Sequence, residues 1–75
     1  MWDSEVNNIF IVPLQLKPPK TVADLRAWSD AHEVTLLGIR QGSEVSLNPR
    51  QDTPLSVGDA AVIVTPTRPS HISLS

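Results

Sequence analysis

The chain has 75 residues, of which six are Lys or Arg and eight are Asp or Glu, and its formal net charge is −2 at pH 7. This length supports one small domain, and the 40% hydrophobic content favours a folded chain over a disordered one. So few basic residues argue against nucleic-acid binding, the absence of cysteine excludes disulfides and thiolate metal sites, and no apolar run reaches the roughly 20 residues of a membrane-spanning helix.

The N-terminal part predicts a leader followed by a strand. Residues 1–8 are mostly polar and are predicted to be a flexible leader without the pattern of a secretory signal, so we expect a cytoplasmic setting. Residues 9–16 have the alternation of a first strand, with Ile9 and Ile11 on one face and apolar residues also on the other. Because Pro13 cannot donate a ladder hydrogen bond, we expect this strand to lie at an edge or to break there.

A helix of about three turns is predicted to begin after Thr21. Thr21 is a good N-cap, and Asp24 three residues later completes a weak form of the capping box. Val22, Leu25 and Trp28 recur at the spacing of one helical face. The favoured interpretation of Trp28 is a core anchor beneath the sheet, and a ligand-stacking role is the alternative.

Residues 34–49 predict a β-hairpin. Two β-rich runs are separated by a polar turn centred on Gly42. In the second run, Val45 and Leu47 are predicted to face the core. The first run is apolar on both faces, and its alternation predicts one face with Thr35, Leu37 and Ile39 and another with Val34, Leu36 and Gly38.

The remaining chain predicts a loop, a turn, a last strand and a tail. Leu55 is the large apolar plug of the loop, and the Gly58-Asp59 pair predicts a turn with Gly58 at positive φ and Asp59 accepting from nearby backbone amides. Residues 60–64 predict the closing strand. Residues 66–75 begin with a Pro-rich stretch and are predicted to be a disordered tail.

In order, the pieces LLGIRQG, EVSLNP, QDTPLSVGD and AVIV resemble the C-terminal regulatory domain of potassium-transport proteins, the TrkA-C (RCK C-terminal) family. The resemblance covers residues 9–65. It implies an α+β fold with one helix packed on a four-stranded, mainly antiparallel sheet. It also implies a non-catalytic, ligand-sensing module of a potassium channel or cation transporter. Such modules act as dimers that bind a small ligand at their interface, in some members the nucleotide cyclic di-AMP.

We therefore expect a ligand near the C-terminal half of the helix and the start of the second strand, at a dimer seam. Arg40 and Arg50 flank the two ends of the hairpin and are the available cations for a phosphate. The candidate ligand residues are Trp28, His32, Thr35, Arg40, Pro49 and Arg50.

No catalytic residue, metal site or cofactor is predicted, and we expect a protein that is not an enzyme. The two histidines have no cysteine to complete a zinc set, the acidic residues are spread over caps and turns, and no nucleophile motif is present.

The predicted partner is a second copy of the chain, because one helix covers one face of a sheet that is apolar on both. The predicted dimer interface consists of Ile9, Ile11, Val34 and Leu36. Direct membrane insertion is not expected, and the resemblance implies that the parent protein is a membrane channel or transporter. The competing interpretation is a β-rich domain that docks a protein or binds a small anion.

Overall fold

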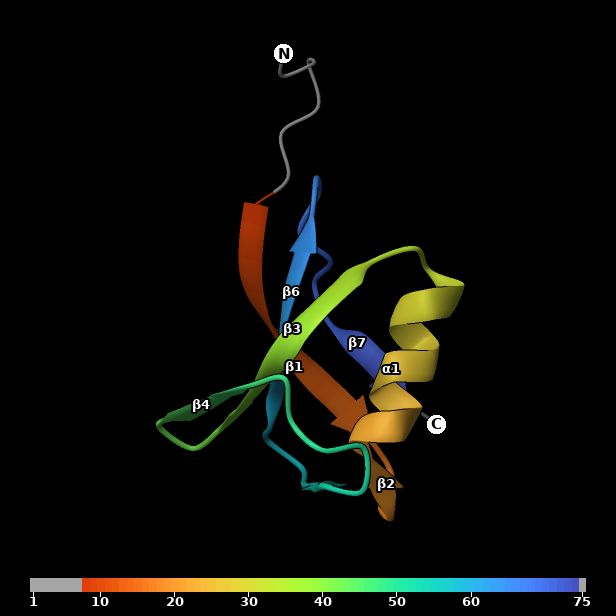
Figure 1. The fold of residues 1–75 in the computed structure, drawn as a ribbon, viewed down its shortest axis with the longest axis vertical. Helices are drawn as coiled ribbons and strands as arrows, with labels where there is room; N and C mark the ends of the chain where they lie inside the picture. Colours follow the sequence, from red (N-terminus) through yellow and green to blue (C-terminus); the bar gives the residue numbers. More distant parts are fainter. Residues whose placement is uncertain (1–7, 75) are drawn as a thin grey trace.

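The computed structural model describes residues 8–74. Its elements are β1 (Asn8–Leu16), β2 (Lys20–Thr21), α1 (Val22–Ala31), β3 (Thr35–Gln41), β4 (Glu44–Leu47), β5 (Pro54–Leu55), β6 (Ala60–Thr65) and β7 (Ile72–Leu74) (Figure 1). The predicted leader lies outside the described residues, apart from Asn8, which begins β1.

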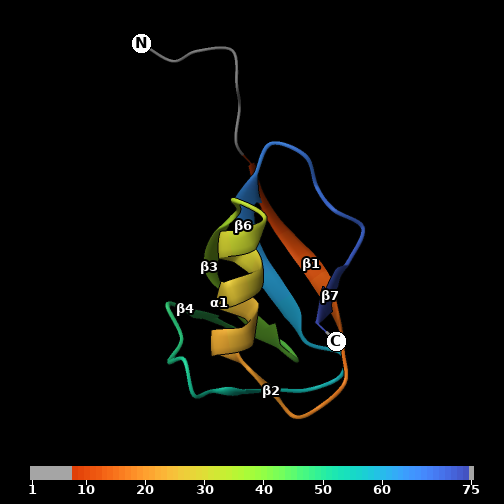
Figure 2. The ribbon, with the colours of Figure 1, turned by 90° about the vertical axis from the view of Figure 1, so that its right-hand side faces the viewer.

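Five strands form one sheet in the order β4-β3-β6-β1-β7, and β2 pairs with β5 separately. All pairings are antiparallel except that of β1 with β7, which is parallel. The predicted α+β class is confirmed. The predicted four-stranded sheet is corrected to a mixed five-stranded one, with α1 packed over one side (Figure 2).

The fifth strand lies in the segment predicted to be disordered. β7 pairs with Leu14–Leu16 of β1, and its Ile72 and Leu74 are 0% and 7% exposed. They join the core because β1 offers a free backbone edge on the side opposite β6. The prediction of a disordered tail is therefore wrong for these residues. Ile72 and Leu74 are ordered by pairing with β1, which lies far away in the sequence, so the local pattern does not reveal this strand.

Pro13 marks the point where β1 changes partners. The ladder with β6 runs from Asn8 to Pro13, and the ladder with β7 begins at Leu14. The strand does not break at Pro13, but the missing N–H falls where one ladder gives way to the next.

The helix start agrees with its prediction. The Thr21 backbone N–H donates to Asp24 Oδ2 at 2.9 Å, which is the reciprocal limb of a capping box. The first two helical amides, of Val22 and Ala23, donate to the carbonyl oxygens of Thr53 and Gln51, each at 3.0 Å. The loop before β5 therefore docks on the start of α1 and uses donors that a helix N-terminus otherwise leaves open.

The core lies between α1 and the sheet face that it covers, which we call the covered face. Trp28 is half-buried and packs at the margin of this core, in agreement with its favoured interpretation, and Leu55 is 4% exposed, as expected of a plug. The buried cluster consists of Val12, Leu14, Val22, Leu25, Ile39, Leu55, Ala61, Ile63, Ile72 and Leu74.

A β-bulge in β3 changes which residues share a face. Leu36 pairs with Ile63 and Gly38 with Val62, so two steps along β3 match one step along β6. Leu36 and Ile39 consequently lie on the same side. The predicted grouping of Leu36 with Gly38 is wrong because simple alternation does not account for the extra residue, Leu37.

Candidate functional site

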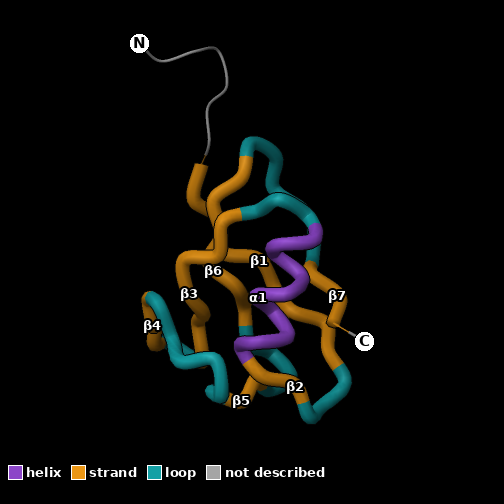
Figure 3. The backbone as a smooth tube through the Cα atoms, turned by 45° about the vertical axis from the view of Figure 1, so that its right-hand side comes forward, coloured by secondary structure: helices purple, strands orange, loops and turns teal. Residues whose placement is uncertain are grey.

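The candidate site is the sheet face turned away from α1, which we call the open face. Directly paired residues of neighbouring strands point to the same side, so the register defines its members. Among residues 8–74, no helix covers this side, as Figures 1 and 3 show by the placement of α1. The open face carries Ile9, Ile11 and Pro13 of β1, Ala60, Val62 and Val64 of β6, Thr35, Gly38 and Arg40 of β3, and Val45 and Leu47 of β4.

Large apolar side chains are exposed along the outer strands of this face. Ile9 and Ile11 are 66% and 41% exposed on β1, and Val45 and Leu47 are 51% and 68% exposed on β4. Between them, Val62 of the central β6 is only 5% exposed although it is not part of the core cluster. The open face therefore has a buried centre and exposed apolar groups at both margins, with Thr35 and Arg40 of β3 as its polar members. Exposed apolar groups gathered on one face are typical of association sites.

The structure corrects two predictions about facing. Val45 and Leu47 pair with Arg40 and Gly38, so they lie on the open face instead of the core. The tight turn at Gly42 pairs Gln41 with Glu44, so Ser46 shares the side of the buried Ile39 while Val45 and Leu47 point to the opposite side.

The predicted dimer interface divides between the two faces. Ile9 and Ile11 lie on the open face, as predicted. Val34 and Leu36 are half-buried and pack against the core cluster instead of lying beside Ile9 and Ile11. Their apolar character has a sufficient explanation in that packing.

The candidate ligand residues on α1 form a pair of their own. The rings of Trp28 and His32 stack with centroids 4.4 Å apart and planes 22° from parallel. His32 Nδ1 lies 2.9 Å from the Trp28 carbonyl oxygen. One face of the Trp28 ring is thus occupied within the chain itself, and the pair lies on the helix side of the sheet.

The other candidate ligand residues lie elsewhere. Thr35 and Arg40 are exposed on the open face, across the sheet from Trp28. Arg50 lies in the loop after β4, where its Nε is 3.5 Å from Asp52 Oδ1, and Pro49 beside it is half-buried. One copy of the chain therefore does not bring the six residues into a single pocket.

A buried hydrogen-bond network joins the end of β3 to the turn before β6. Asp59 is 6% exposed and accepts at Oδ2 from Gln41 Nε2 and from the Ser56 backbone N–H, both at 2.9 Å. Gln41 Nε2 also donates to the Pro54 carbonyl oxygen at 3.1 Å. Gly58 has φ 98°, so the predicted turn geometry is confirmed. The sequence reasoning missed Gln41, because its partner lies 18 residues away and no local pattern links them.

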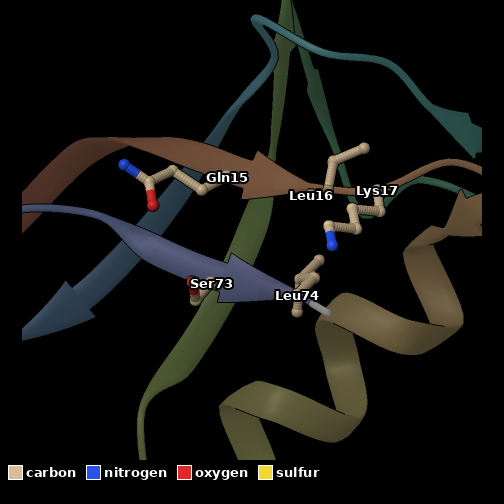
Figure 4. A pocket seen from close by; sticks show the side chains of 5 residues that line it. All are labelled: Gln15, Leu16, Lys17, Ser73 and Leu74. Atoms are coloured by element: carbon tan, nitrogen blue, oxygen red, sulfur yellow. The ribbon is translucent and has the colours of Figure 1, made fainter.

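A cavity of about 230 Å³ lies at the C-terminal ends of β1 and β7. Figure 4 shows its lining, which consists of Gln15, Leu16, Lys17, Ser73 and Leu74. None of the candidate ligand residues belongs to it. Pockets that bind drug-sized ligands typically have volumes of about 300–1,000 Å³, so this cavity is smaller than the usual range.

Within the described part of the chain, no group of three or more His, Asp or Glu side chains is placed to hold a metal ion. No helix there combines the length and apolar character needed to cross a membrane.

Comparison of the chain with protein-family models, curated proteins and solved structures gives no match.

Proposed function

We propose that this domain is a non-catalytic regulatory module that acts as a homodimer, similar to the TrkA-C domains of potassium channels and cation transporters. The observation that carries the proposal is the open face, on which Ile9, Ile11, Val45 and Leu47 are all at least 41% exposed. Burial of such groups is favourable by about 25 cal/mol per Å² of apolar surface.

A second copy is a suitable partner because the domain is small. In a chain of 75 residues the buried cluster supplies limited stability, and small domains commonly gain more by association. The same apolar surface on two copies is self-complementary in chemistry, which a two-fold dimer requires.

In the proposed regulatory role, a small ligand binds between two copies and favours the geometry that fits it. Trp28 with His32 and Thr35 with Arg40 lie on opposite sides of one copy, and the observed cavity is small. A nucleotide such as cyclic di-AMP would therefore need surface from both copies. In this proposal the domain is a cytoplasmic part of a parent membrane channel or transporter.

A protein-docking module is the second candidate function. The dispersal of the basic side chains favours it, because Arg40 and Arg50 do not converge on one pocket. Docking through an apolar face needs no such convergence.

The first experiment measures mass by light scattering at tens of micromolar, an order of magnitude suited to weak interfaces. We expect the mass of a dimer, and we expect Leu47→Asp to lower it because this open-face position of β4 would bring a charge to the interface. Val57→Asp is the matched control, since Val57 is 74% exposed on a loop. A parent chain that stays monomeric over this range contradicts the proposal.

The second experiment separates ligand sensing from docking on a confirmed dimer. Cyclic dinucleotides, adenine nucleotides and simple anions are added, and the melting temperature is recorded. A ligand at a hundred times its dissociation constant stabilises the fold by about 2.7 kcal/mol, which shifts the melting temperature of a small domain by several degrees. If no compound produces a shift, the docking module replaces the sensor.

A further inference from the structure

The two outer edges of the five-stranded sheet differ in how they are protected. At the edge formed by β1 and β7, Arg68 Nη2 donates to the Ile11 carbonyl oxygen at 3.2 Å, and Pro13 has no N–H to offer. β7 itself has three residues. Short strands, proline and basic side chains are the usual means of preventing a sheet edge from pairing with another chain.

The opposite edge, β4, is also short, with four residues, but it lacks the proline and the basic side chain. Its sequence from Glu44 to Leu47 contains no proline, lysine or arginine, and all four of its residues are exposed. Among the described residues, β3 is its sheet neighbour and no strand pairs with its outer side.

The hydrogen-bond alternation identifies the backbone groups that β4 leaves unpaired. The Asn48 N–H donates to the Leu37 carbonyl oxygen at 2.9 Å, and Ser46 pairs with Ile39 two steps along the same ladder. In an antiparallel ladder every second residue turns its N–H and C=O toward the neighbouring strand. Ser46 and Asn48 therefore face β3, whereas Val45 and Leu47 turn their backbone groups outward.

We propose that two copies of the chain join through β4, paired antiparallel about a two-fold axis, with Val45 of each copy opposite Leu47 of the other. This inference rests on the homodimer of the proposed function and places its contact at the β4 edge, beside the open face. Each Val45–Leu47 pair exchanges both of its backbone hydrogen bonds, so the outward groups of both residues are satisfied.

Other registers satisfy fewer of these groups. With Val45 opposite itself, Leu47 meets Ser43 of the turn. With Leu47 opposite itself, Val45 meets Pro49, which has no N–H. A shift of one residue places Val45 opposite Ser46, whose backbone groups already face β3.

The side chains agree with the proposed register. Ser46 lies opposite Ser46 of the second copy, and Glu44 lies opposite Asn48, so no like charges meet. Val45 and Leu47 of both copies stay on the same side of the joined sheet. The two open faces then lie side by side on one surface of the dimer, with the apolar side chains of β4 at its centre.

The decisive variant is Ser46→Cys, which introduces the single thiol of a chain without cysteine. In the proposed register the two copies of this position form a non-hydrogen-bonded pair with Cα atoms about 4.5 Å apart, inside the range for a disulfide. We expect mild oxidation to convert most of the protein to a covalent dimer on a non-reducing gel. Glu44→Cys is the control, because its two thiols would lie about 14 Å apart along the strand at about 3.4 Å per residue.

A second pair of variants tests the backbone. Val45→Pro removes an N–H that points away from β3, which an edge strand tolerates, so the hairpin is expected to remain folded by circular dichroism. We expect the dissociation constant to rise at least tenfold, a factor worth about 1.4 kcal/mol. Val45→Thr keeps the N–H and the β-branched shape and is expected to weaken the dimer less.

The outcomes separate this inference from the proposed function. A dimer that forms the Ser46→Cys crosslink and is weakened by Val45→Pro supports the β4 pairing and the homodimer of the proposed function. A dimer that Val45→Pro does not weaken and that forms no crosslink through Ser46→Cys overturns the β4 pairing but leaves self-association through the open face. A monomeric parent chain contradicts both.

Discussion

Both faces of the sheet carry apolar residues, but α1 covers only one of them. On β6, Ala61 and Ile63 point to the covered face and are 0% exposed beneath α1. Ala60 and Val62 point to the open face and are also nearly buried, at 1% and 5%, although they lie on the side away from α1. The difference lies at the margins, where β1 and β4 expose large apolar groups on the open face alone. Burial of the central strand therefore does not indicate that a face is covered.

The largest expected effect separates the faces directly. Leu25 is 0% exposed in α1 over the covered face, so Leu25→Ala should lower the free energy of unfolding by about 2–5 kcal/mol at any protein concentration. Leu47→Ala on the open face should cost little in the monomer, and its cost should grow at concentrations where dimers form. Urea unfolding at two protein concentrations measures both. Equal, concentration-independent losses for the two variants would remove the distinction between the faces.

A smaller effect is expected at Gly38, which lies on the open face between β4 and β6. A Cβ at this position would overlap the Ser46 carbonyl oxygen, which is backbone and cannot rotate away. We expect Gly38→Ala to cost about 1–3 kcal/mol by forcing β4 from β3. The variant should also weaken dimers that depend on β4. Denaturation and light scattering test the two parts, and an unchanged unfolding midpoint would contradict this close contact.

The turn before β6 provides a contrast in mechanism. Gly58 has φ 98°, and an added Cβ would meet no atom within 4 Å. Gly58→Val should therefore cost about 1–3 kcal/mol through backbone strain alone, without affecting dimer formation. Thermal unfolding with light scattering would check it, and a variant as stable as the parent chain would argue against this backbone conformation in solution.

The smallest expected effect is a gain in stability at the end of α1. Glu33 has φ 56°, a left-handed conformation that glycine adopts without strain. Glu33→Gly should raise the free energy of unfolding by up to about 1 kcal/mol, because glycine is the preferred residue after a helix end. Asp30→Gly is the control, since it lies inside the helix and should destabilise by about 0.5–1 kcal/mol. A loss of stability in Glu33→Gly would contradict the expected gain.

Several features were predictable from the sequence because short-range interactions determine them. The capping box joins Thr21 and Asp24 across three residues, the hairpin turn depends on Gly42 at φ 65°, and the last turn depends on Gly58 and Asp59. The apolar spacing of α1 likewise identified its buried side. Local sequence contains all the partners in these cases.

Other features depended on partners far along the chain. Ile72 and Leu74 are ordered by the free edge of β1, and Gln41 meets Asp59 only when the hairpin folds back on the turn. The dispersal of the candidate ligand residues over two faces and a loop is likewise a property of the assembled sheet.

The sequence by itself determined the α+β class, the helix, the hairpin and the presence of apolar groups on both sides of the sheet. Only the tertiary structure decided which groups point to which side. One bulge at Leu37 brings both Leu36 and Ile39 to the covered face, and the pairing of Gln41 with Glu44 across the turn places Val45 and Leu47 on the open face. The physical reason is that strand alternation has a period of two, so a single inserted residue reverses every assignment beyond it.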